Sequence, residues 1–321
     1  MSSGTGLVET LWAGFATLNR RLDLLALPIA VNLVAWLGPR LTARPVVEGA
    51  GAAFASWFAA AAADPSLGLS AEQARQVSEE LAAQMRLLAS ANLVTLVGWA
   101  LPGMIALDEP LGQPVVELEG RALLGALVAL LALGLASAAM FYQQVASAVR
   151  GESLRLLQLL GGVPRFVLRQ AGWIAILLAA AAIAGVPFLL VIGLASILSP
   201  ALGVAVLFVS WGLLLIAAWG LFFHTSAMFF DDVGPLRAVV GSVAVVARHR
   251  GPSLLFVAVV SLITTGWGLV WSGLEGVPAS NLLRIAGHAY LSCGLVVATM
   301  IFYRDRTVAV VSTARAEQQA G

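Results

Sequence analysis

Long apolar stretches separated by short polar segments dominate the hydropathy pattern of the chain. A helix needs roughly 20 mostly apolar residues to cross the hydrocarbon core of a bilayer. Six stretches have about this length, and the predicted membrane spans are 22–38, 122–145, 171–198, 202–226, 252–274 and 284–303. The pattern therefore predicts an all-α fold, a multi-pass transmembrane helical bundle built as one integral membrane domain over residues 1–321.

A seventh apolar run, 91–107 (ANLVTLVGWALPGMIAL), is long enough to cross but is interrupted by Asn92, Gly98, Pro102 and Gly103. Counting it as a span gives a seven-span alternative with the N-terminus outside. We expect instead that this run is re-entrant or interfacial, so that it dips into the bilayer or lies along it.

Three amphipathic stretches end in basic residues and lead directly into a predicted span. They are LVETLWAGFATLNRR, SLRLLQLLGGVPRFVLR and LRAVVGSVAVVARHR. In the first, one face at helical spacing carries Leu7, Leu11, Trp12, Phe15 and Leu18. This is typical of a helix that lies in the membrane interface. We expect three such elbow helices on one side of the membrane, which favours six spans over seven.

The arginines indicate an orientation. All 18 basic residues are arginines, and the six-span arrangement places twelve on the side of both termini and six on the other. Basic residues accumulate on the cytoplasmic side, so we expect both termini there. The seven-span alternative divides the arginines 14 to 4, so the count alone does not decide. Residues 39–121 are then an extracytoplasmic cap, with a helix predicted in SAEQARQVSEELAAQMRLL.

Composition excludes several classes of protein. The chain is 60% hydrophobic and 11% charged, whereas soluble domains carry about 25% charged residues. Its net charge of +1 and the lack of a basic patch argue against a nucleic-acid partner. A single cysteine, Cys293, lies in an apolar run, so it predicts a buried, unreactive thiol without a disulfide framework.

Several stretches together resemble an uncharacterised family of bacterial six-span membrane proteins. They are LNRRLDLLALPIAVNLVAWLGPRL, ANLVTLVGWALPGM, FFHTSAMFFDDVGPLRAVVGSVAVV and AGHAYLSCGLVVATMIFYRDR. This family is similar in layout to the membrane domains attached to glycerophosphodiester phosphodiesterases. The resemblance implies six spans, interfacial elbow helices and a place in the bacterial inner (cytoplasmic) membrane. It implies no catalytic residues, because the phosphodiesterase activity belongs to a separate soluble barrel domain that this sequence does not contain.

The stretch FFHTSAMFFDDV (222–233) holds the first polar candidates, His224, Asp231 and Asp232. One interpretation is a metal or proton site, since ionisable residues inside membranes often serve function. The other is the end of a membrane helix at the water interface. About 20 residues from Pro200 use up the hydrocarbon core, which puts His224 at the cytoplasmic interface. Ser210, Ala217, His224 and Asp231 recur every seven residues and would share one helix face. We expect interface anchoring.

The last span holds the second group. One face, within about 60° at 100° per residue, carries His288, Ser292, Thr299, Tyr303 and Arg306. This face is either a polar track along a substrate path or a set of hydrogen bonds to neighbouring helices, and we expect the second. His288 lies near the outer face, so about 27 Å of depth separates it from His224. The two histidines are therefore not expected to share a metal.

Searches for catalytic motifs find no HExxH, GxSxG, P-loop or GxGxxG sequence, so we expect no catalytic, cofactor-binding or metal-binding residues and no cofactor. The expected function is a non-enzymatic membrane module or an accessory in envelope or lipid handling. Two alternatives stay open. One is a transporter or channel-like component that uses the polar face of the last span, and the other is an intramembrane lipid-modifying enzyme. The lipid bilayer is the expected partner, with a protein partner or a second copy left open.

Overall fold

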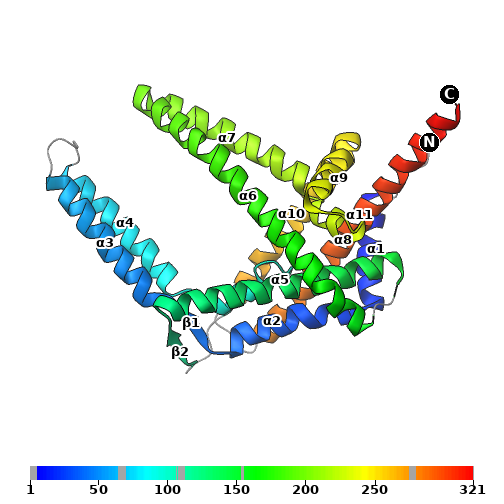
Figure 1. Cartoon of the computed structure of the whole chain (residues 1–321), viewed down its shortest axis with the longest axis horizontal. Coiled ribbons are helices and arrows are strands. Elements are labelled where there is room, and N and C mark those ends of the chain that lie inside the picture. Colours follow the sequence, from blue (N-terminus) through cyan, green and yellow to red (C-terminus); the bar gives the residue numbers. More distant parts are fainter. Residues whose placement is uncertain are drawn as a thin grey trace.

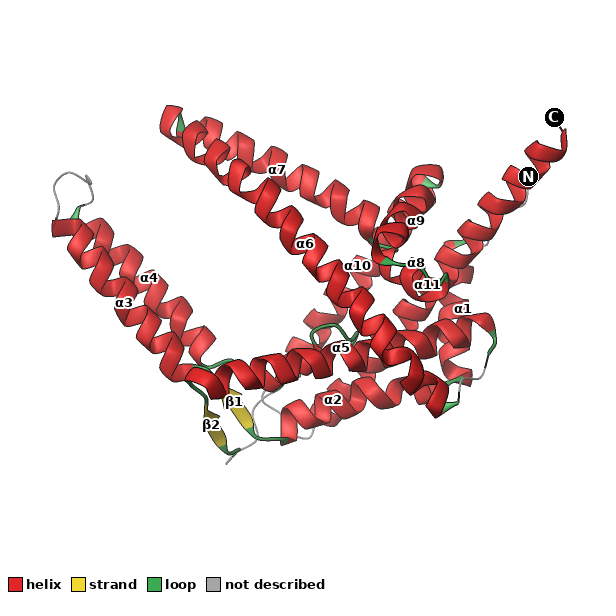
Figure 2. Cartoon of the chain, viewed as in Figure 1, coloured by secondary structure: helices red, strands yellow, loops and turns green. Residues whose placement is uncertain are grey.

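The computed structural model describes residues 6–63, 70–105, 107, 113–152, 155–274 and 280–320, with side chains for all of these except 71, 73 and 309–320. Helices make up almost all of the described chain (Figure 2). In chain order the elements are α1 (Leu7–Arg20), η1 (Leu22–Leu25), α2 (Ala26–Leu37), β1 (Arg40–Thr42), α3 (Arg44–Ala63), α4 (Ala71–Ala89), η3 (Leu93–Gly98), β2 (Val115–Glu117), α5 (Gly120–Arg150), α6 (Leu156–Leu198), α7 (Pro200–Leu221), α8 (His224–Phe230), α9 (Pro235–Arg248), α10 (Arg250–Ser272) and α11 (Ser280–Ala320).

The predicted all-α, multi-pass architecture is confirmed, because six of the described helices are long and apolar enough to cross a membrane. One of these six helices is not among the six predicted spans. The predicted span 22–38 is only a shorter apolar helix, Leu22–Leu37, whereas α3, assigned to the cap, meets the requirement. The reason is composition: the apolar run of α3 consists mainly of alanines, which are weaker membrane signals than leucine or isoleucine.

Two of the three predicted elbow helices are separate elements, α1 and α9, of 14 residues each. The second is not. α6 runs without interruption for 43 residues from Leu156 to Leu198, so the predicted elbow and its span form one helix. Pro164 and Pro187 lie inside α6 without ending it. A proline removes only one backbone hydrogen bond, and membrane helices tolerate this when local adjustments satisfy the freed carbonyl.

α1 packs antiparallel along the middle of α11. The Tyr290 hydroxyl donates to Asn19 Oδ1 at 2.9 Å toward one end of the contact. Toward the other end, a Cβ added to Gly14 would lie 2.6 Å from Ala298 Cβ and 2.8 Å from its Cα. Gly294 of α11 leaves the corresponding space for the ring of Phe15. The first amphipathic helix therefore packs on the last apolar helix and is part of the bundle.

The helix that was predicted over 202–226 is interrupted after Leu221, and α8 begins at His224. Ser242 of α9, which is fully buried, bridges the break. Its hydroxyl donates to the Gly220 carbonyl at 2.7 Å and accepts from the Phe223 N–H at 3.1 Å. A side chain inserted into the hydrogen-bond ladder is a recognised cause of a helix kink. The predicted single face from Ser210 to Asp231 is therefore interrupted at this point.

Replacing Ser242 with alanine should destabilise the protein by about 1–3 kcal/mol, the usual cost of leaving a buried backbone donor unsatisfied. Thermal unfolding in detergent measures this change. Ser272→Ala is the matched control, because the Ser272 hydroxyl bonds only Leu269 O of its own helix at an exposed position. Equal melting temperatures for the two variants would show that Ser242 does not hold the break.

The chain between α2 and α5 forms an excursion from the bundle, and two short strands close its base. β1 and β2 form a short parallel pair in which Arg40 lies opposite Val115 and Thr42 opposite Glu117. Between the two strands, α3 and α4 pack against each other as a hairpin that projects from the rest of the chain (Figure 1). The paired strands hold the two ends of the predicted 39–121 segment together. Strands of three residues are too short to give a sequence signal, and they were not predicted.

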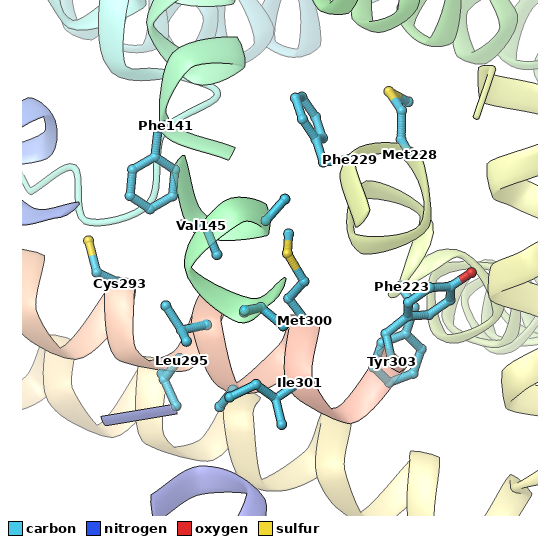
Figure 3. Close-up of a cluster of buried hydrophobic side chains, with 14 of the residues drawn as sticks. Phe141, Val145, Phe223, Met228, Phe229, Cys293, Leu295, Met300, Ile301 and Tyr303 are labelled. Carbon is cyan, nitrogen blue, oxygen red and sulfur yellow. The ribbon is translucent and has the colours of Figure 1, made fainter. Parts of the chain in front are cut away.

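The hydrophobic core lies where α5, α8 and α11 meet (Figure 3). Phe302 of α11 stacks on Phe223 at 5.3 Å and on Phe256 of α10 at 4.5 Å between ring centroids. Cys293 is buried there as a free thiol, as predicted. The hairpin of α6 and α7, in contrast, extends away from this core (Figure 1) and exposes leucine, isoleucine and valine side chains along most of its length. Exposed apolar area of this size is what lipid covers in a membrane protein.

Candidate functional site

The described residues of the interrupted segment 91–107 fold as η3 and a series of turns rather than as a span, and they pack against α2, α5 and α11. Buried Asn32 of α2 holds it by donating to the Gly103 carbonyl at 2.8 Å and accepting from the Ile105 N–H at 3.2 Å. Gly103 has φ +83°, and a Cβ there would lie 3.0 Å from Ala289 Cα. Glycine is required because this backbone conformation and this approach to α11 both disfavour a side chain. Gly103, one of the residues that interrupt this apolar run, is thus a point where the segment is anchored.

A cavity of about 440 Å³ lies between this segment and α11. Three of the polar residues predicted on the last span line it: His288, Ser292 and Thr299. Eleven residues at 1.5 Å each make this polar edge about 16 Å long. The other helices add Tyr142, Thr225, Ser226 and Thr264. Apolar walls come from Leu101, Pro102, Met104, Phe222, Val260, Leu295 and Val296.

The polar lining is uncharged, and two of its hydroxyls are held as acceptors. No Asp, Glu, Lys or Arg is among the described residues that line the cavity. The hydroxyls of Thr264 and Thr299 donate to the carbonyls of Val260 and Leu295, at 2.8 and 2.7 Å. Since each hydroxyl proton is used within its own helix, each oxygen keeps a lone pair for a bound group. His288 Nδ1 is buried and has no hydrogen-bond partner.

A smaller cavity of about 210 Å³ lies beside the first and shares Trp99, Tyr142 and Thr225 with it. It is lined by His224 and by Gln170, whose Oε1 is buried without a partner. The three shared residues separate the two cavities. Thr225 therefore lies between His224 and the polar edge of α11, with one cavity on each side.

His224 ends α7 with its own side chain. Nδ1 lies 2.8 Å from the Leu221 carbonyl, and Nε2 lies 3.2 Å from the Thr225 hydroxyl. A carbonyl only accepts, so the proton is assigned to Nδ1, and Nε2 then accepts from Thr225. The ring also packs on Trp173 at 4.5 Å between centroids. Both nitrogens of the neutral imidazole are engaged, which fits an anchoring role.

Asp231 and Asp232 fasten the end of α8 to two other helices. The Tyr303 hydroxyl of α11 donates to Asp231 Oδ2 at 2.5 Å. Asp232, at φ +55°, accepts from Arg169 at 2.6 Å and pairs with Arg165 at 3.1 Å, both from α6. The two carboxylates thus tie the α8–α9 junction to α6 and α11. The structure places Tyr303 in this clamp and not in the cavity.

Burial raises the pKa of the Asp231 carboxyl above its ordinary value of 3.8, and the hydrogen bond from Tyr303 opposes that rise. A raised pKa means that the folded protein binds this proton more tightly than the unfolded chain does. The resulting contribution to stability is complete below pH 3.8 and is lost as the pH rises through the folded pKa. Asp231→Asn should remove this part of the pH dependence.

Both Asp231→Asn and Asp232→Asn should leave the protein folded and inserted. The asparagine carbonyl at 231 can still accept from Tyr303. At 232 the two lost ion pairs share a carboxylate that is 47% exposed and therefore solvated, although Arg165 is 55% exposed and Arg169 only 20%. Such exposed pairs contribute at most about 1 kcal/mol each. Expression level and thermal unfolding from pH 4 to 8 test this. Severe loss of folded protein in either variant would contradict the anchoring role.

The structure thus divides the predicted candidates into two groups. His288, Ser292 and Thr299 gather at the large cavity, whereas His224, Asp231, Asp232 and Tyr303 make structural contacts around the ends of α7 and α8. The cavity residues on α5, α8 and α10 were missed, because no periodicity within one helix links them to α11. In the described part of the chain, no three His, Cys, Asp or Glu side chains are grouped as a metal site requires.

Comparison with protein-family models, with curated proteins and with solved structures finds no match to this chain.

Proposed function

We propose that the protein is a non-enzymatic module of a bacterial inner membrane that holds a neutral amphiphilic molecule in the cavity beside α11. Such a module would act as an accessory in envelope or lipid handling. The observation that carries the proposal is an uncharged polar edge facing apolar walls within a cavity of about 440 Å³. Cavities of roughly 300–1,000 Å³ with apolar walls and a few polar groups are typical of small-molecule sites.

The lining favours a ligand with a hydrogen-bond donor and an apolar body. The oxygens of Thr264 and Thr299 are acceptors, and the unpartnered His288 Nδ1 adds a further polar atom. A hydroxyl-bearing head group meets these requirements without needing a counter-ion. Thr264 is itself exposed, so the cavity opens beside α10, where an amphiphile could enter from the bilayer.

Filling the cavity should displace the ligand. Protein extracted in a mild detergent is analysed by native mass spectrometry and by extraction of bound lipid. We expect a neutral amphiphile in the unmodified protein and at least about a tenfold loss in Thr264→Leu, where leucine replaces the polar acceptor. Thr265→Leu is the control, because Thr265 is the next residue and does not line the cavity. Equal retention in the two variants, or an absence of bound amphiphile, would contradict the proposal.

Transport by the same face of α11 is a second candidate, favoured by the length of the polar edge from His288 to Thr299. Water-soluble reagents would reach a transport path from both sides of the membrane, whereas a binding cavity opens to the bilayer. Labelling Ser292→Cys in a Cys293→Ala background with charged thiol reagents separates the two. Labelling from both aqueous sides would favour transport.

We also propose that both termini are cytoplasmic. The antiparallel packing of α1 on α11 supports a shared side for the two termini, because the start of α1 points toward the C-terminal end of α11. The distribution of arginines favours the cytoplasm as that side. Reporter fusions at Gly4 and Ala320 should both report the cytoplasm. An external signal at Gly4 would instead support the seven-span alternative.

A further inference from the structure

A separate cavity of about 540 Å³ lies between the last turns of α1 and Tyr290 of α11. It is lined by Trp12, Phe15, Ala16, Asn19, Arg20 and Tyr290. None of these residues lines the cavity beside the polar edge of α11. Its location and chemistry differ from those of the proposed amphiphile site, so a ligand here does not depend on that function.

Arg20 carries an uncompensated positive charge at one end of this cavity. The adjacent Arg21 is held by Asp23, with two nitrogen–oxygen distances of 2.9 Å. Arg20 itself is exposed, and within the described residues no carboxylate pairs with it. Of the two consecutive arginines, one is therefore neutralised inside the protein and one is available for an external anion.

Asn19 adds a second donor beside Arg20. Its Oδ1 accepts from the Tyr290 hydroxyl at 2.9 Å, which fixes the orientation of the amide and leaves its NH₂ group as a donor. A guanidinium and an amide NH₂ together can bind the oxygens of a phosphate, since charge-assisted hydrogen bonds to phosphate are among the strong ones in proteins.

The opposite end of the cavity is aromatic. The Phe15 and Tyr290 rings lie 5.6 Å apart, and Trp12 is 75% exposed. Trp12 is eight residues before Arg20, about 12 Å along the helix. The exposed ring of Trp12 offers apolar surface that the chain of a lipid can cover. Arg21 also donates to the Glu152 carbonyl, beside Arg150 at the polar end of α5, which places this end of α1 among charged groups.

We infer that this cavity binds the phosphate head group of an anionic glycerophospholipid. Arg20 and Asn19 hold the phosphate, and the aromatic end contacts the glycerol and the upper acyl chain. A soluble phosphate would use the polar end alone. The exposed aromatic side chains and the amphipathic character of α1 favour the lipid as the source of the phosphate.

Lipid titration of the full-length protein by native mass spectrometry tests this inference. Phosphatidylglycerol should bind more tightly than phosphatidylcholine. Arg20→Gln should weaken phosphatidylglycerol binding about fivefold, the effect expected for one arginine near a membrane surface. Arg20→Lys should restore part of the affinity. Arg248→Gln is the matched control, because Arg248 is an exposed arginine at the end of the comparable helix α9, outside this cavity.

Equal binding of the two lipids, or an equal loss in Arg20→Gln and Arg248→Gln, would overturn the inference. Inorganic phosphate at millimolar concentration should compete only weakly, and full displacement of the lipid by it would indicate a soluble ligand instead. Unfolding temperatures of all variants show whether any loss of binding reflects misfolding.

Discussion

Replacing Gly14 with valine should separate α1 from α11 and destabilise the protein by about 3 kcal/mol or more, at the upper end of the range for overpacking. A single added carbon at Gly14 would already lie 2.8 Å from the backbone N and Cα of Ala298. Backbone atoms of a long helix cannot rotate aside as a flexible side chain can. Valine adds two further carbons at the same place. Thermal unfolding in detergent and limited proteolysis near the N-terminus should both report the change.

The matched control is Gly212→Ala in α7. An added Cβ there meets nothing within 4 Å. Alanine is also the better helix former, by about 1 kcal/mol, so this variant should be neutral or slightly more stable. If Gly14→Val were equally stable, the close packing of α1 on α11 would be wrong.

Replacing Asn32 with leucine should have the second large effect, because it releases the segment that forms one wall of the cavity. The Asn32 side chain is 1% exposed and bonds both the Gly103 carbonyl and the Ile105 N–H. Leaving these two backbone groups without partners, one buried and one half-buried, should destabilise the protein by about 2–4 kcal/mol. Thermal unfolding measures this loss, and faster hydrogen exchange across residues 98–105 would locate it.

Asn92→Leu provides the comparison. Asn92 also holds this segment, through bonds to the Val94 and Leu41 N–H groups, but at a more exposed position. Water can replace these bonds, so the loss should be clearly smaller. Equal losses in the two variants would argue against Asn32 as the main anchor of the cavity wall.

Sequence patterns predicted the features that arise from the spacing of residues within a single helix. The long apolar helices and the polar face of α11 follow from spacing along a single element, so the sequence alone groups His288, Ser292 and Thr299, which line one cavity. The unusual composition of 91–107 also correctly indicated that this run does not form a continuous span.

Features that depend on contacts between distant elements were not predicted. The break between α7 and α8 depends on Ser242, which lies 20 residues beyond the break and gives no local signal. α6 continues past Arg169, where the sequence pattern placed the end of an elbow helix and the start of a span. The clamp formed by Asp231 and Asp232 requires Tyr303 and Arg169, far apart in the chain. Tertiary packing determined each of these features.

The central claim, that the cavity beside α11 holds a neutral amphiphile, is tested most directly by photo-cross-linking. A diacylglycerol analogue with a photoreactive group next to its hydroxyl is incorporated into membranes with the full-length protein, and the modified peptides are identified by mass spectrometry. Our account predicts adducts on the cavity-lining segments 98–104 and 288–299, reduced by excess unlabelled diacylglycerol and reduced in Thr264→Leu. Adducts confined to the exposed hairpin of α6 and α7, with none on those two segments, would contradict it.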